Sequence, residues 1–443
     1  MLPRLLSVLL AGLMLTSYVV ADSWPQFRGP AGTGSTTGKL PLQWGNDRNV
    51  AWKVELPGVG WSSPVVVGDR VFITTAVTDK QPKAKGFTEG TRDLRSMIPF
   101  GATPPNVEYR WEILCLERST GKQLWRQTVV RKKPDIPVHP SNTFATESPV
   151  TDGRHVCALF GPAGVLCCLD RDGKELWRRE FEPAPMTAGF GTGSSLALAD
   201  GRVFVQRDNE KKSFLLALDI RTGKQLWRVD RDSKSSWSTP LLWRNAQRAE
   251  LVVGGTGKLI SYDPASGKEL WRLTGIPATF TASPTADTER IYFGTSSPTT
   301  AGKLYAVKAG ASGDITPTSE DTSSSFVAWT INGTSPGMPS PVVKDGLLYL
   351  AGSGFLTCID GKTGERVYRS RLAKTRSIAA SLWIVGDLLY VLDEDGTTQV
   401  FKTGPKFEPV ARNQVEGLFW ATPAVAGNEL FLRSADRLYC IRE

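Results

Sequence analysis

The chain has 443 residues, a formal net charge of +9 and only two histidines, His139 and His155. So few histidines exclude a multi-histidine zinc site, and a Ser-His-Asp triad would have to use one of these two. The charge is modest for this length and the aromatic residues are not interleaved with basic runs, so the composition gives no specific support for nucleic-acid binding.

Residues 1–21 have the features of a secretory signal peptide. Arg4 precedes an apolar stretch from Leu5 to Val20, and small residues ending at Ala21 form a cleavage site. The stretch is shorter than the roughly 20 residues that a membrane-spanning helix requires, and a retained anchor is the alternative interpretation. We therefore expect an exported chain, periplasmic or extracellular, with no integral membrane segment after cleavage.

Two short segments come before the repeats. Residues 22–48 begin with the motif Trp24-Pro25-Gln26-Phe27-Arg28-Gly29-Pro30 and continue as a Gly/Thr-rich leader. We expect this leader to pack on the fold that follows it. Residues 49–56 then have the pattern of a single strand with no partner nearby in the sequence.

A phrase that ends in an aromatic and a basic residue recurs along the rest of the chain. Its fullest form, Asp-x-x-Thr-Gly-Lys-x-Leu-Trp-Arg, occupies residues 219–228, and successive terminal aromatics are 52, 50, 44, 58 and 39 residues apart. The carboxylate and glycine are typical of a tight hairpin turn, and the alternation that follows is typical of a half-buried strand. We predict that the aromatic residues at this position pack structurally against the neighbouring repeat: Trp52, Trp125, Trp177, Trp227, Trp271, Trp329 and Tyr368.

A second set of residues, found at an equivalent position in each repeat, marks the repeats independently. Serine or threonine, usually followed by proline, opens eight short apolar runs: Ser63, Ser148, Ser195, Thr239, Ser283, Ser340, Ser381 and Thr422. The units average about 49 residues, which is the size of a four-stranded propeller blade. The sequence therefore predicts an all-β, eight-bladed propeller of four-stranded antiparallel blades over residues 49–443. The last unit has only three strands, so we predict that residues 49–56 complete it and close the ring.

The blade repeat also suggests places for the inserts and the cysteines. Inserts at about 77–110 and 309–325 are expected to be surface loops. Cys115, Cys168, Cys358 and Cys440 share one place in their repeats, which we interpret as a small-residue packing position. Residues at this position in different blades are too far apart for a bridge. Cys157 alone faces possible partners, Cys168 in register and Cys167 one register away, and the pattern leaves open whether it forms a disulfide.

One group of residues could bind a ligand. The residues just before the first strand of each blade are expected at the mouth of the central channel: Trp61, Phe144, Glu147, Phe190, Trp237, Phe280, Met338 and Trp420. A ring of aromatics with one carboxylate could bind a planar ligand or a peptide, or it could simply plug the channel.

Catalytic motifs are missing from the sequence. It contains no phosphate-binding loop with its lysine. The acidic segments at 170–173 and 393–396 look like fragments of a calcium loop, but they lack the later glutamate, and we interpret them as turn carboxylates. We predict no catalytic residue and no metal site.

The repeated phrases and the Ser/Thr-Pro openers resemble the tryptophan-docking repeats of the pyrroloquinoline-quinone-like β-propeller superfamily, over nearly all of residues 49–443. This superfamily includes quinoprotein alcohol dehydrogenases, an outer-membrane-protein assembly lipoprotein and uncharacterised exported propellers, whose leader is similar to the Trp24–Pro30 motif. In the dehydrogenases the quinone stacks between a tryptophan and a disulfide of adjacent cysteines, and calcium or a lanthanide is bound by Glu, Asn and Asp. Cys167-Cys168 is an adjacent pair, but here it is predicted inside a strand.

These observations lead to one main functional expectation. We expect a monomeric, exported, non-catalytic scaffold without cofactor that binds a protein or another macromolecular ligand through loops on one face. The alternative is a pyrroloquinoline-quinone-dependent alcohol or sugar dehydrogenase with calcium. A hydrolase or a glycan-binding activity at the channel mouth is a third reading.

Overall fold

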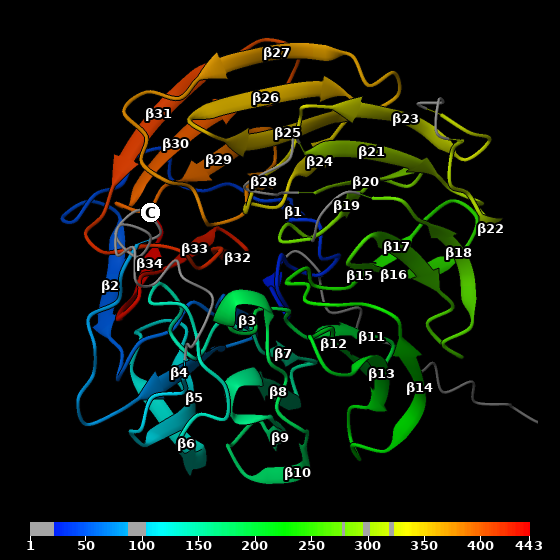
Figure 1. The fold of residues 1–443 in the computed structure, drawn as a ribbon. Coiled ribbons are helices and arrows are strands. Elements are labelled where there is room, and N and C mark those ends of the chain that lie inside the picture. Colours follow the sequence, from blue (N-terminus) through cyan, green and yellow to red (C-terminus); the bar gives the residue numbers. More distant parts are fainter. Residues whose placement is uncertain (1–21, 87–102, 277–279, 296–301, 319–322) are drawn as a thin grey trace, which may run out of the picture.

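A computed structural model describes residues 22–86, 103–276, 280–295, 302–318 and 323–443. The predicted signal peptide lies outside these residues, as do parts of both predicted inserts. Eight sheets are arranged in a ring around a central axis, called the channel below, with almost no helix (Figure 1). Two short 3-10 turns, η2 (Gly161–Ala163) and η3 (Thr187–Gly189), lie between strands. The predicted eight-bladed, all-β fold is confirmed.

In the first four blades the strands run in chain order from the channel to the rim. Their bounds are, for blade 1, β3 (Val65–Val67), β4 (Arg70–Val77), β5 (Tyr109–Glu117) and β6 (Gln123–Lys132); for blade 2, β7 (Val150–Thr151), β8 (His155–Phe160), β9 (Val165–Asp170) and β10 (Glu175–Glu180); for blade 3, β11 (Ala197–Ala199), β12 (Arg202–Arg207), β13 (Ser213–Asp219) and β14 (Gln225–Arg231); and for blade 4, β15 (Leu241–Arg244), β16 (Ala249–Gly255), β17 (Lys258–Tyr262) and β18 (Glu269–Leu273), with β22 (Gly313–Asp314) added at the outer edge.

Blades 5 to 7 follow the same plan, and blade 8 is assembled from both ends of the chain. Their bounds are, for blade 5, β19 (Thr285–Ala286), β20 (Arg290–Gly294), β21 (Lys303–Lys308) and β23 (Val327–Asn332); for blade 6, β24 (Val342–Lys344), β25 (Leu347–Gly352), β26 (Phe355–Asp360) and β27 (Arg366–Arg371); for blade 7, β28 (Trp383–Val385), β29 (Leu388–Leu392), β30 (Thr397–Lys402) and β31 (Pro409–Gln414), with β1 (Ser35–Thr36) at the inner edge; and for blade 8, β32 (Ala424–Ala426), β33 (Glu429–Arg433), β34 (Arg437–Ile441) and β2 (Val50–Glu55).

The ring closes in blade 8 as the sequence predicts. Strand β2 pairs antiparallel with the C-terminal strand β34, with Trp52 opposite Cys440 and Glu55 opposite Arg437. Trp52 and Leu56 are both buried. The N-terminal and C-terminal strands are therefore joined by main-chain hydrogen bonds within the sheet of blade 8, and the edge of the C-terminal strand β34 is paired.

At the rim, most blades are joined to the next by one repeated contact. The indole Nε1 of Trp177 donates to the carbonyl of Ile220 in the turn of the next blade, at 2.7 Å. Gly223 in that turn lies flat against the ring, and a Cβ there would come within 2.6 Å of it. Four further tryptophans make the same pair of contacts with the next blade: Trp52 with Arg118 and Gly121, Trp125 with Arg171 and Gly173, Trp227 with Pro264 and Gly267, and Trp329 with Gly361 and Gly364.

Two of the expected docking residues behave differently. Trp271 is fully buried but donates to Glu250 of its own blade, at 2.6 Å, because blade 5 has no Thr-Gly-Lys turn to receive it. Strand β22 instead pairs parallel with β18 and places the buried Ile315 in the same apolar cluster. The Tyr368 hydroxyl has no hydrogen-bond partner among the described residues, and its ring contacts Phe407 edge-on, with the centroids 5.9 Å apart.

Around the channel, the Ser/Thr openers form a ring of hydrogen bonds. The hydroxyl oxygen of each opener accepts the backbone N–H of the opener in the preceding blade, at 2.9–3.1 Å, in seven steps from Ser63 to Thr422. Among the described residues the eighth step is open, because the Ser63 hydroxyl has no partner. The openers therefore join neighbouring blades, which explains why serine and threonine recur at this position.

The leader lies at the centre of the ring (Figure 1). Trp24 is fully buried and exchanges two backbone hydrogen bonds with Val66 of blade 1, while β1 pairs with β28 of blade 7. The fully buried Arg28 guanidinium donates to the carbonyls of Pro284 and Pro341, from blades 5 and 6. Burial lowers the pKa of Arg28 to about 9. These contacts tie blades from opposite sides of the channel together.

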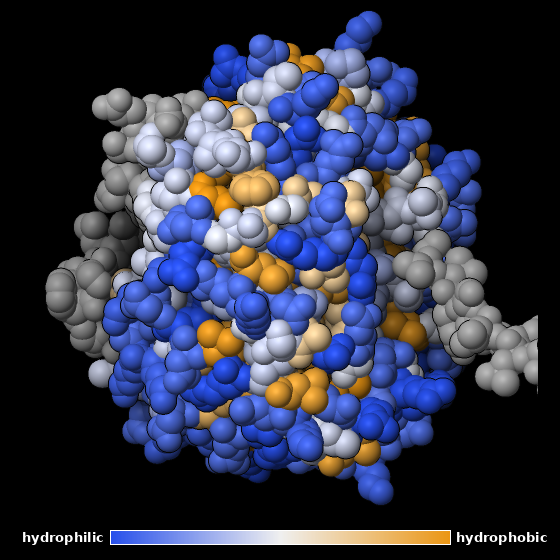
Figure 2. Space-filling model, turned by 90° about the vertical axis from the view of Figure 1, so that its right-hand side faces the viewer, coloured by the Kyte–Doolittle hydropathy of each residue, from blue (hydrophilic) through white to orange (hydrophobic). Residues whose placement is uncertain are grey.

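The outside of the molecule is mostly polar. Figure 2 shows small, separate hydrophobic areas on a largely hydrophilic side of the propeller. Three leucines are exposed at equivalent positions of the outermost strands of blades 1, 2 and 3: Leu124, Leu176 and Leu226. None of the helices in the described part of the chain has the length and apolar character needed to cross a membrane.

Candidate functional site

Three linkers meet at one end of the channel, where the chain crosses between blades 1, 2, 3 and 4. The linker before β7 is tied to the loop before β3 by the Trp61 indole, which donates to the Ser141 carbonyl at 2.7 Å. The Asn142 amide donates to the Phe190 carbonyl at 3.2 Å, and the Trp237 indole donates to the Gly191 carbonyl at 2.7 Å. This end, which we call the mouth, is thus built from loops that hold one another in place.

Three aromatic rings at the mouth form a small cluster, which we call the mouth aromatics: His139, Phe190 and Trp237. Phe190 is 41% exposed, whereas His139 is buried and stacks against it with ring centroids 5.2 Å apart. Trp237 is half-buried and meets Phe190 edge-on at 6.0 Å. Burial lowers the pKa of His139, so its ring is neutral at pH 7. The cluster therefore presents one exposed phenyl ring on an uncharged aromatic base.

The loop that carries Phe190 has an unusual backbone. Gly189 and Gly191 on either side of the ring both have positive φ, as does Ala188 at φ 50°. A left-handed conformation at a non-glycine residue costs roughly 1–2 kcal/mol. The Phe190 side chain is thus held outward by a strained turn, and it is not folded back into the core.

Next to these aromatics lies a polar pocket, which we call the mouth pocket. Its polar lining comes from Glu147, Thr192, Ser194, Gln206, Arg207, Asp208 and Ser236, and its apolar lining from Leu159, Ala184 and Met186. It offers about 10 Å³ to the centre of a water molecule, which is room for about one water. Gly193 joins the pocket to the aromatics, since a Cβ at this position would lie 3.2 Å from the Trp237 ring.

The acidic and basic groups of the pocket are unequally satisfied. Asp208 is buried and accepts two hydrogen bonds from the equally buried Arg231, at 2.9 and 3.1 Å, and a third from the Gln206 amide. Glu147 is only 1% exposed, yet neither of its carboxylate oxygens has a hydrogen-bond partner among the described residues, and the same holds for the Gln206 carbonyl. The pocket therefore keeps unused acceptors.

Burial dominates the electrostatics of the pocket. It raises the pKa of Glu147 and lowers that of Arg207 to about 10. The Arg207 guanidinium is also buried, donates to the Glu182 carbonyl at 3.0 Å and lies over the Phe181 ring. The Thr192 hydroxyl and, more weakly, the charge of Arg207 oppose the rise in the Glu147 pKa, so this carboxyl has one hydroxyl and one cation in its surroundings.

A second part of the mouth lies between blades 7, 8 and 1. Trp61 stacks on Trp420 with ring centroids 5.6 Å apart, and the Trp420 indole donates to Glu394 at 2.6 Å. Beneath them, the fully buried Arg433 donates to the carbonyls of Ser62 and Thr74. Burial lowers the pKa of Arg433 to about 9. This side of the mouth is closed by packing.

The structure separates the residues predicted at the mouth into two kinds. Trp61 and Phe144 are buried against neighbouring loops and Phe280 is fully buried, so these three rings pack and do not face a ligand. Phe190 is exposed, and the side chains of Trp237, Met338 and Trp420 are half-buried. The predicted residues come together in two groups among the described residues: Glu147 with Phe190 and Trp237, and Trp61 with Trp420.

Four polar residues of this region are not in the predicted set: Gln206, Arg207, Asp208 and Arg231. They come from the ends of β12 and β14, about 60 to 85 residues after Glu147 in the sequence. One sequence signal could have found three of them, since Gln206-Arg207-Asp208 ends a strand that is otherwise mostly apolar. Three polar residues at the buried end of a strand indicate a polar interior.

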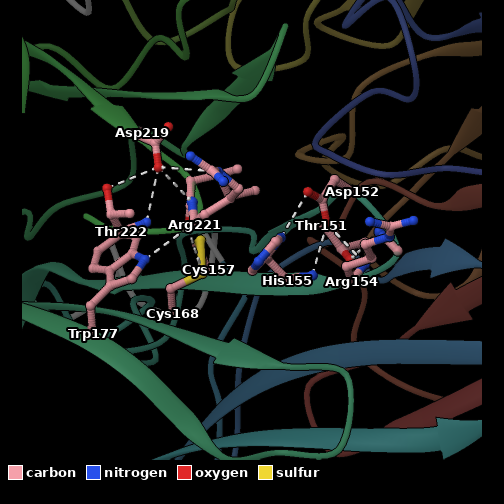
Figure 3. The surroundings of a disulfide bond; sticks show 12 residues. Thr151, Asp152, Arg154, His155, Cys157, Cys168, Trp177, Asp219, Arg221 and Thr222 are labelled. Carbon is pink, nitrogen blue, oxygen red and sulfur yellow. Dashed lines mark hydrogen bonds and ion pairs between the residues drawn. A yellow bond between two sulfur atoms is a disulfide. The ribbon is translucent and has the colours of Figure 1, made fainter. Parts of the chain in front are cut away.

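The structure places a disulfide between Cys157 and Cys168, across the paired strands β8 and β9 (Figure 3). Cys168 also faces the carbonyl of Ile220, which accepts the Trp177 indole. The disulfide thus lies beneath the junction of blades 2 and 3. Cys115, Cys358 and Cys440, in the same column of the repeat, are free and buried, as is Cys167.

Comparison with known proteins places this architecture. A family model described as "Outer membrane protein assembly factor BamB" matches residues 110–307. The crystal structure of BamB from Moraxella catarrhalis has a TM-score of 0.59 at 13% identity, and the match covers 89% of this chain and 99% of that chain. At this identity the similarity concerns the fold alone. The fold and the matched repeats are consistent with the pyrroloquinoline-quinone-like β-propellers.

Curated relatives match this propeller over shorter stretches. The polyvinylalcohol dehydrogenase of a Pseudomonas species is 25% identical over 228 residues, which are 40% of this chain and 35% of that protein. The quinohemoprotein alcohol dehydrogenase ADH-IIG of Pseudomonas putida is 29% identical over 131 residues, which are 26% of this chain and 18% of that protein. The matches thus span about a third or less of these relatives' own lengths.

The described residues do not fit the quinone site that the resemblance implies. Cys167 and Cys168 are adjacent, but both are fully buried inside β9, and Cys168 is bonded to Cys157 and not to its neighbour. No three His, Cys, Asp or Glu side chains gather as a metal-binding group in the described part of the chain. Among the described residues, the adjacent-cysteine surface against which a quinone would stack is therefore not formed.

Proposed function

We propose that this protein is an exported, non-catalytic scaffold that binds a protein or another macromolecular ligand through the loops of the mouth. The observation that carries the proposal is the exposed Phe190 ring, held outward by a strained turn. Every other large side chain predicted at the mouth is buried or half-buried. Exposed aromatic anchors on a preorganised surface are typical of binding sites.

Two further observations support a scaffold. The blades are joined by the opener ring, the leader and the rim tryptophans, which gives the mouth loops a rigid base. The family model that matches residues 110–307 is described as an outer membrane protein assembly factor. Sites are nevertheless grafted onto folds independently, so the choice of ligand must come from the mouth itself.

Site-specific photocross-linking in the native compartment tests this proposal. A benzophenone side chain placed at Phe190 is expected to give discrete cross-linked products, because this position faces the ligand. The matched control is Leu226, which is 44% exposed but lies at the rim on β14. Equal products at both positions, or none at Phe190, would contradict binding through the mouth.

The second candidate function is a quinone-dependent alcohol or sugar dehydrogenase, which the sequence matches to dehydrogenases favour. It is tested by reconstitution of the purified chain with pyrroloquinoline quinone and calcium, followed by dye reduction with polyvinyl alcohol, simple alcohols and sugars. On the scaffold proposal we expect neither quinone binding at micromolar concentration nor dye reduction. Substrate-dependent turnover would replace the scaffold proposal with the enzymatic one.

A further inference from the structure

The mouth pocket has the hydrogen-bonding character of a site that is built for a ligand. Glu147 and Gln206 are 1% and 3% exposed, and both carboxylate oxygens of Glu147 and the carbonyl oxygen of Gln206 lack partners among the described residues. A buried polar atom left without a hydrogen bond costs roughly 1–3 kcal/mol. Three such acceptors beside one pocket are therefore a large cost unless something donates to them.

Most of the other polar groups of the pocket are already engaged. The Gln206 amide donates to Asp208 at 2.9 Å and to the Gly254 carbonyl at 2.6 Å. Asp208 is paired with Arg231, and the Ser194 hydroxyl donates to the Ser238 carbonyl at 2.9 Å. The Thr192 hydroxyl lies beside Glu147, also has no partner among the described residues, and can donate to one of its carboxylate oxygens. The second carboxylate oxygen and the Gln206 carbonyl then remain as acceptors, so the missing group must be a hydrogen-bond donor.

The charges around the pocket favour a neutral donor. The negative charge of Asp208 is matched by Arg231, and the carboxylate of Glu147 is opposed by the buried Arg207. An ammonium group would approach Arg207, and an anion would approach Glu147 and Asp208. A hydroxyl group donates without bringing a net charge, and one hydroxyl has the size of the water for which the pocket has room.

The aromatic side of the mouth adds a second requirement. Gly193 connects the pocket to the half-buried Trp237, which in turn contacts the exposed Phe190 ring. Apolar ring faces next to a few placed polar groups are typical of sites for ligands that are both hydroxylated and apolar on one face. A sugar ring has this character, since its hydroxyls lie at the edge and its C–H groups on the face.

From this arrangement we propose that the mouth is a binding site for a neutral carbohydrate chain. One sugar hydroxyl enters the pocket and donates to Glu147 or Gln206, and the adjoining sugar face lies on Phe190 and Trp237. This inference rests on the proposed function, because it takes the mouth as the binding face. It narrows the macromolecular ligand to a glycan.

Oligosaccharide titration tests the inference. The mature chain is titrated with maltohexaose, cellohexaose and laminarihexaose by calorimetry and tryptophan fluorescence, and a hexagalacturonate and a chitosan hexamer serve as charged probes. We expect at least one neutral hexamer to bind, and both charged hexamers to bind at least tenfold more weakly. Absence of binding by every neutral hexamer at millimolar concentration would overturn the carbohydrate assignment.

Three variants locate the binding. Phe190→Ala and Glu147→Ala should each weaken the saccharide at least tenfold, because they remove the stacking surface and the acceptor. Glu147→Gln keeps one acceptor oxygen and should weaken it less than Glu147→Ala. Leu226→Ala at the rim should change nothing, and the melting temperature of each variant checks its fold. Binding that is equal in all variants would place the saccharide elsewhere and overturn the inference.

The outcome separates this inference from the broader proposal. If Phe190 gives discrete cross-linked protein products while no neutral saccharide binds, the scaffold proposal stands and the carbohydrate assignment falls. If neither result appears, both fall.

Discussion

The rim of the propeller and the mouth of its channel differ in how completely their buried polar groups are paired. At the rim, the indole N–H of each of the five docking tryptophans has a backbone carbonyl in the next blade, and the sixth, Trp271, has Glu250. At the mouth, Glu147 and the Gln206 carbonyl have no partner among the described residues. Complete pairing stabilises the ring, whereas the unpaired acceptors leave capacity for a ligand.

The largest effect is expected from a substitution at the junction of blades 4 and 5. Only here does a side chain, and not a carbonyl, hold the docking tryptophan. Glu250 is fully buried and also accepts from Ser261 at 2.6 Å and Asn245 at 2.9 Å, and it pairs with Arg248. Glu250→Ala leaves these donors unpaired and should cost about 3–5 kcal/mol.

Urea unfolding followed by tryptophan fluorescence measures this loss. Glu250→Gln, which keeps the shape and one acceptor oxygen, should cost clearly less than Glu250→Ala. If the two variants unfold at the same urea concentration, the carboxylate is not what holds Trp271 in place.

A second comparison uses two glycines with the same backbone conformation. Gly223 at φ 67° lies against the Trp177 ring, whereas Gly313 at φ 69° in β22 has open space around it. Alanine at either position costs roughly 1–2 kcal/mol for the left-handed backbone. At Gly223 its Cβ would also lie 2.6 Å from the indole, so overpacking should add about 1–3 kcal/mol.

The difference between Gly223→Ala and Gly313→Ala in the urea midpoint therefore isolates the docking contact. The repeated turn is then worth more to the fold than the strand that replaces it at blade 5. Equal losses at the two glycines would show that the tryptophan moves aside without cost.

A smaller loss of stability is expected in the opener ring, which is the ring of hydrogen bonds between the Ser/Thr openers. The ring also contains a matched control position. The Ser195 hydroxyl accepts the backbone N–H of Ser148 at 2.9 Å, whereas the Ser63 hydroxyl has no partner among the described residues. Ser195→Ala should therefore cost about 1–3 kcal/mol, and Ser63→Ala about 0.5 kcal/mol or less. Thermal unfolding of the two variants distinguishes them, and similar shifts would mean that the ring contributes through packing and not through hydrogen bonds.

The repeated parts of the molecule could be predicted from the sequence because they obey a period. Trp177 and Gly223 recur with their turns, and this spacing predicts the blades, their number and the closing strand. The opener ring was not foreseen, since a one-dimensional pattern shows that Ser148 and Ser195 are equivalent but not that one bonds to the other. The departure at Trp271 could have been foreseen, because the sequence of blade 5 lacks the turn.

The mouth could be predicted only in part, because it is made of linkers that follow no period. Phe190 and Phe280 both precede an inner strand, yet one is 41% exposed and the other fully buried. Phe280 packs on Gly254, where there is no side chain to exclude it, while the strained turn holds Phe190 outward. Such outcomes depend on contacts with other blades, which also explains why Arg207 and Asp208 were missed.

The last prediction concerns Glu147. Here the substitution is expected to raise the free energy of unfolding relative to the native chain, whereas the substitutions at the rim lower it. Burial raises the pKa of Glu147 in the folded chain above its ordinary value, so the folded state binds this proton more tightly than the unfolded state. The stability that comes from the protonated form is fully present below the unfolded pKa and is lost as the pH rises through the folded pKa. The glutamine of Glu147→Gln cannot ionise and escapes this loss. The free energy of unfolding of the variant should therefore rise relative to that of the native chain as the pH increases from 4 to 7. The pKa of the buried Asp393 is raised too, but it is present in both proteins and cancels in the difference. A difference in unfolding free energy that stays constant with pH would mean that the Glu147 carboxylate is already paired, and the contrast between mouth and rim would then disappear.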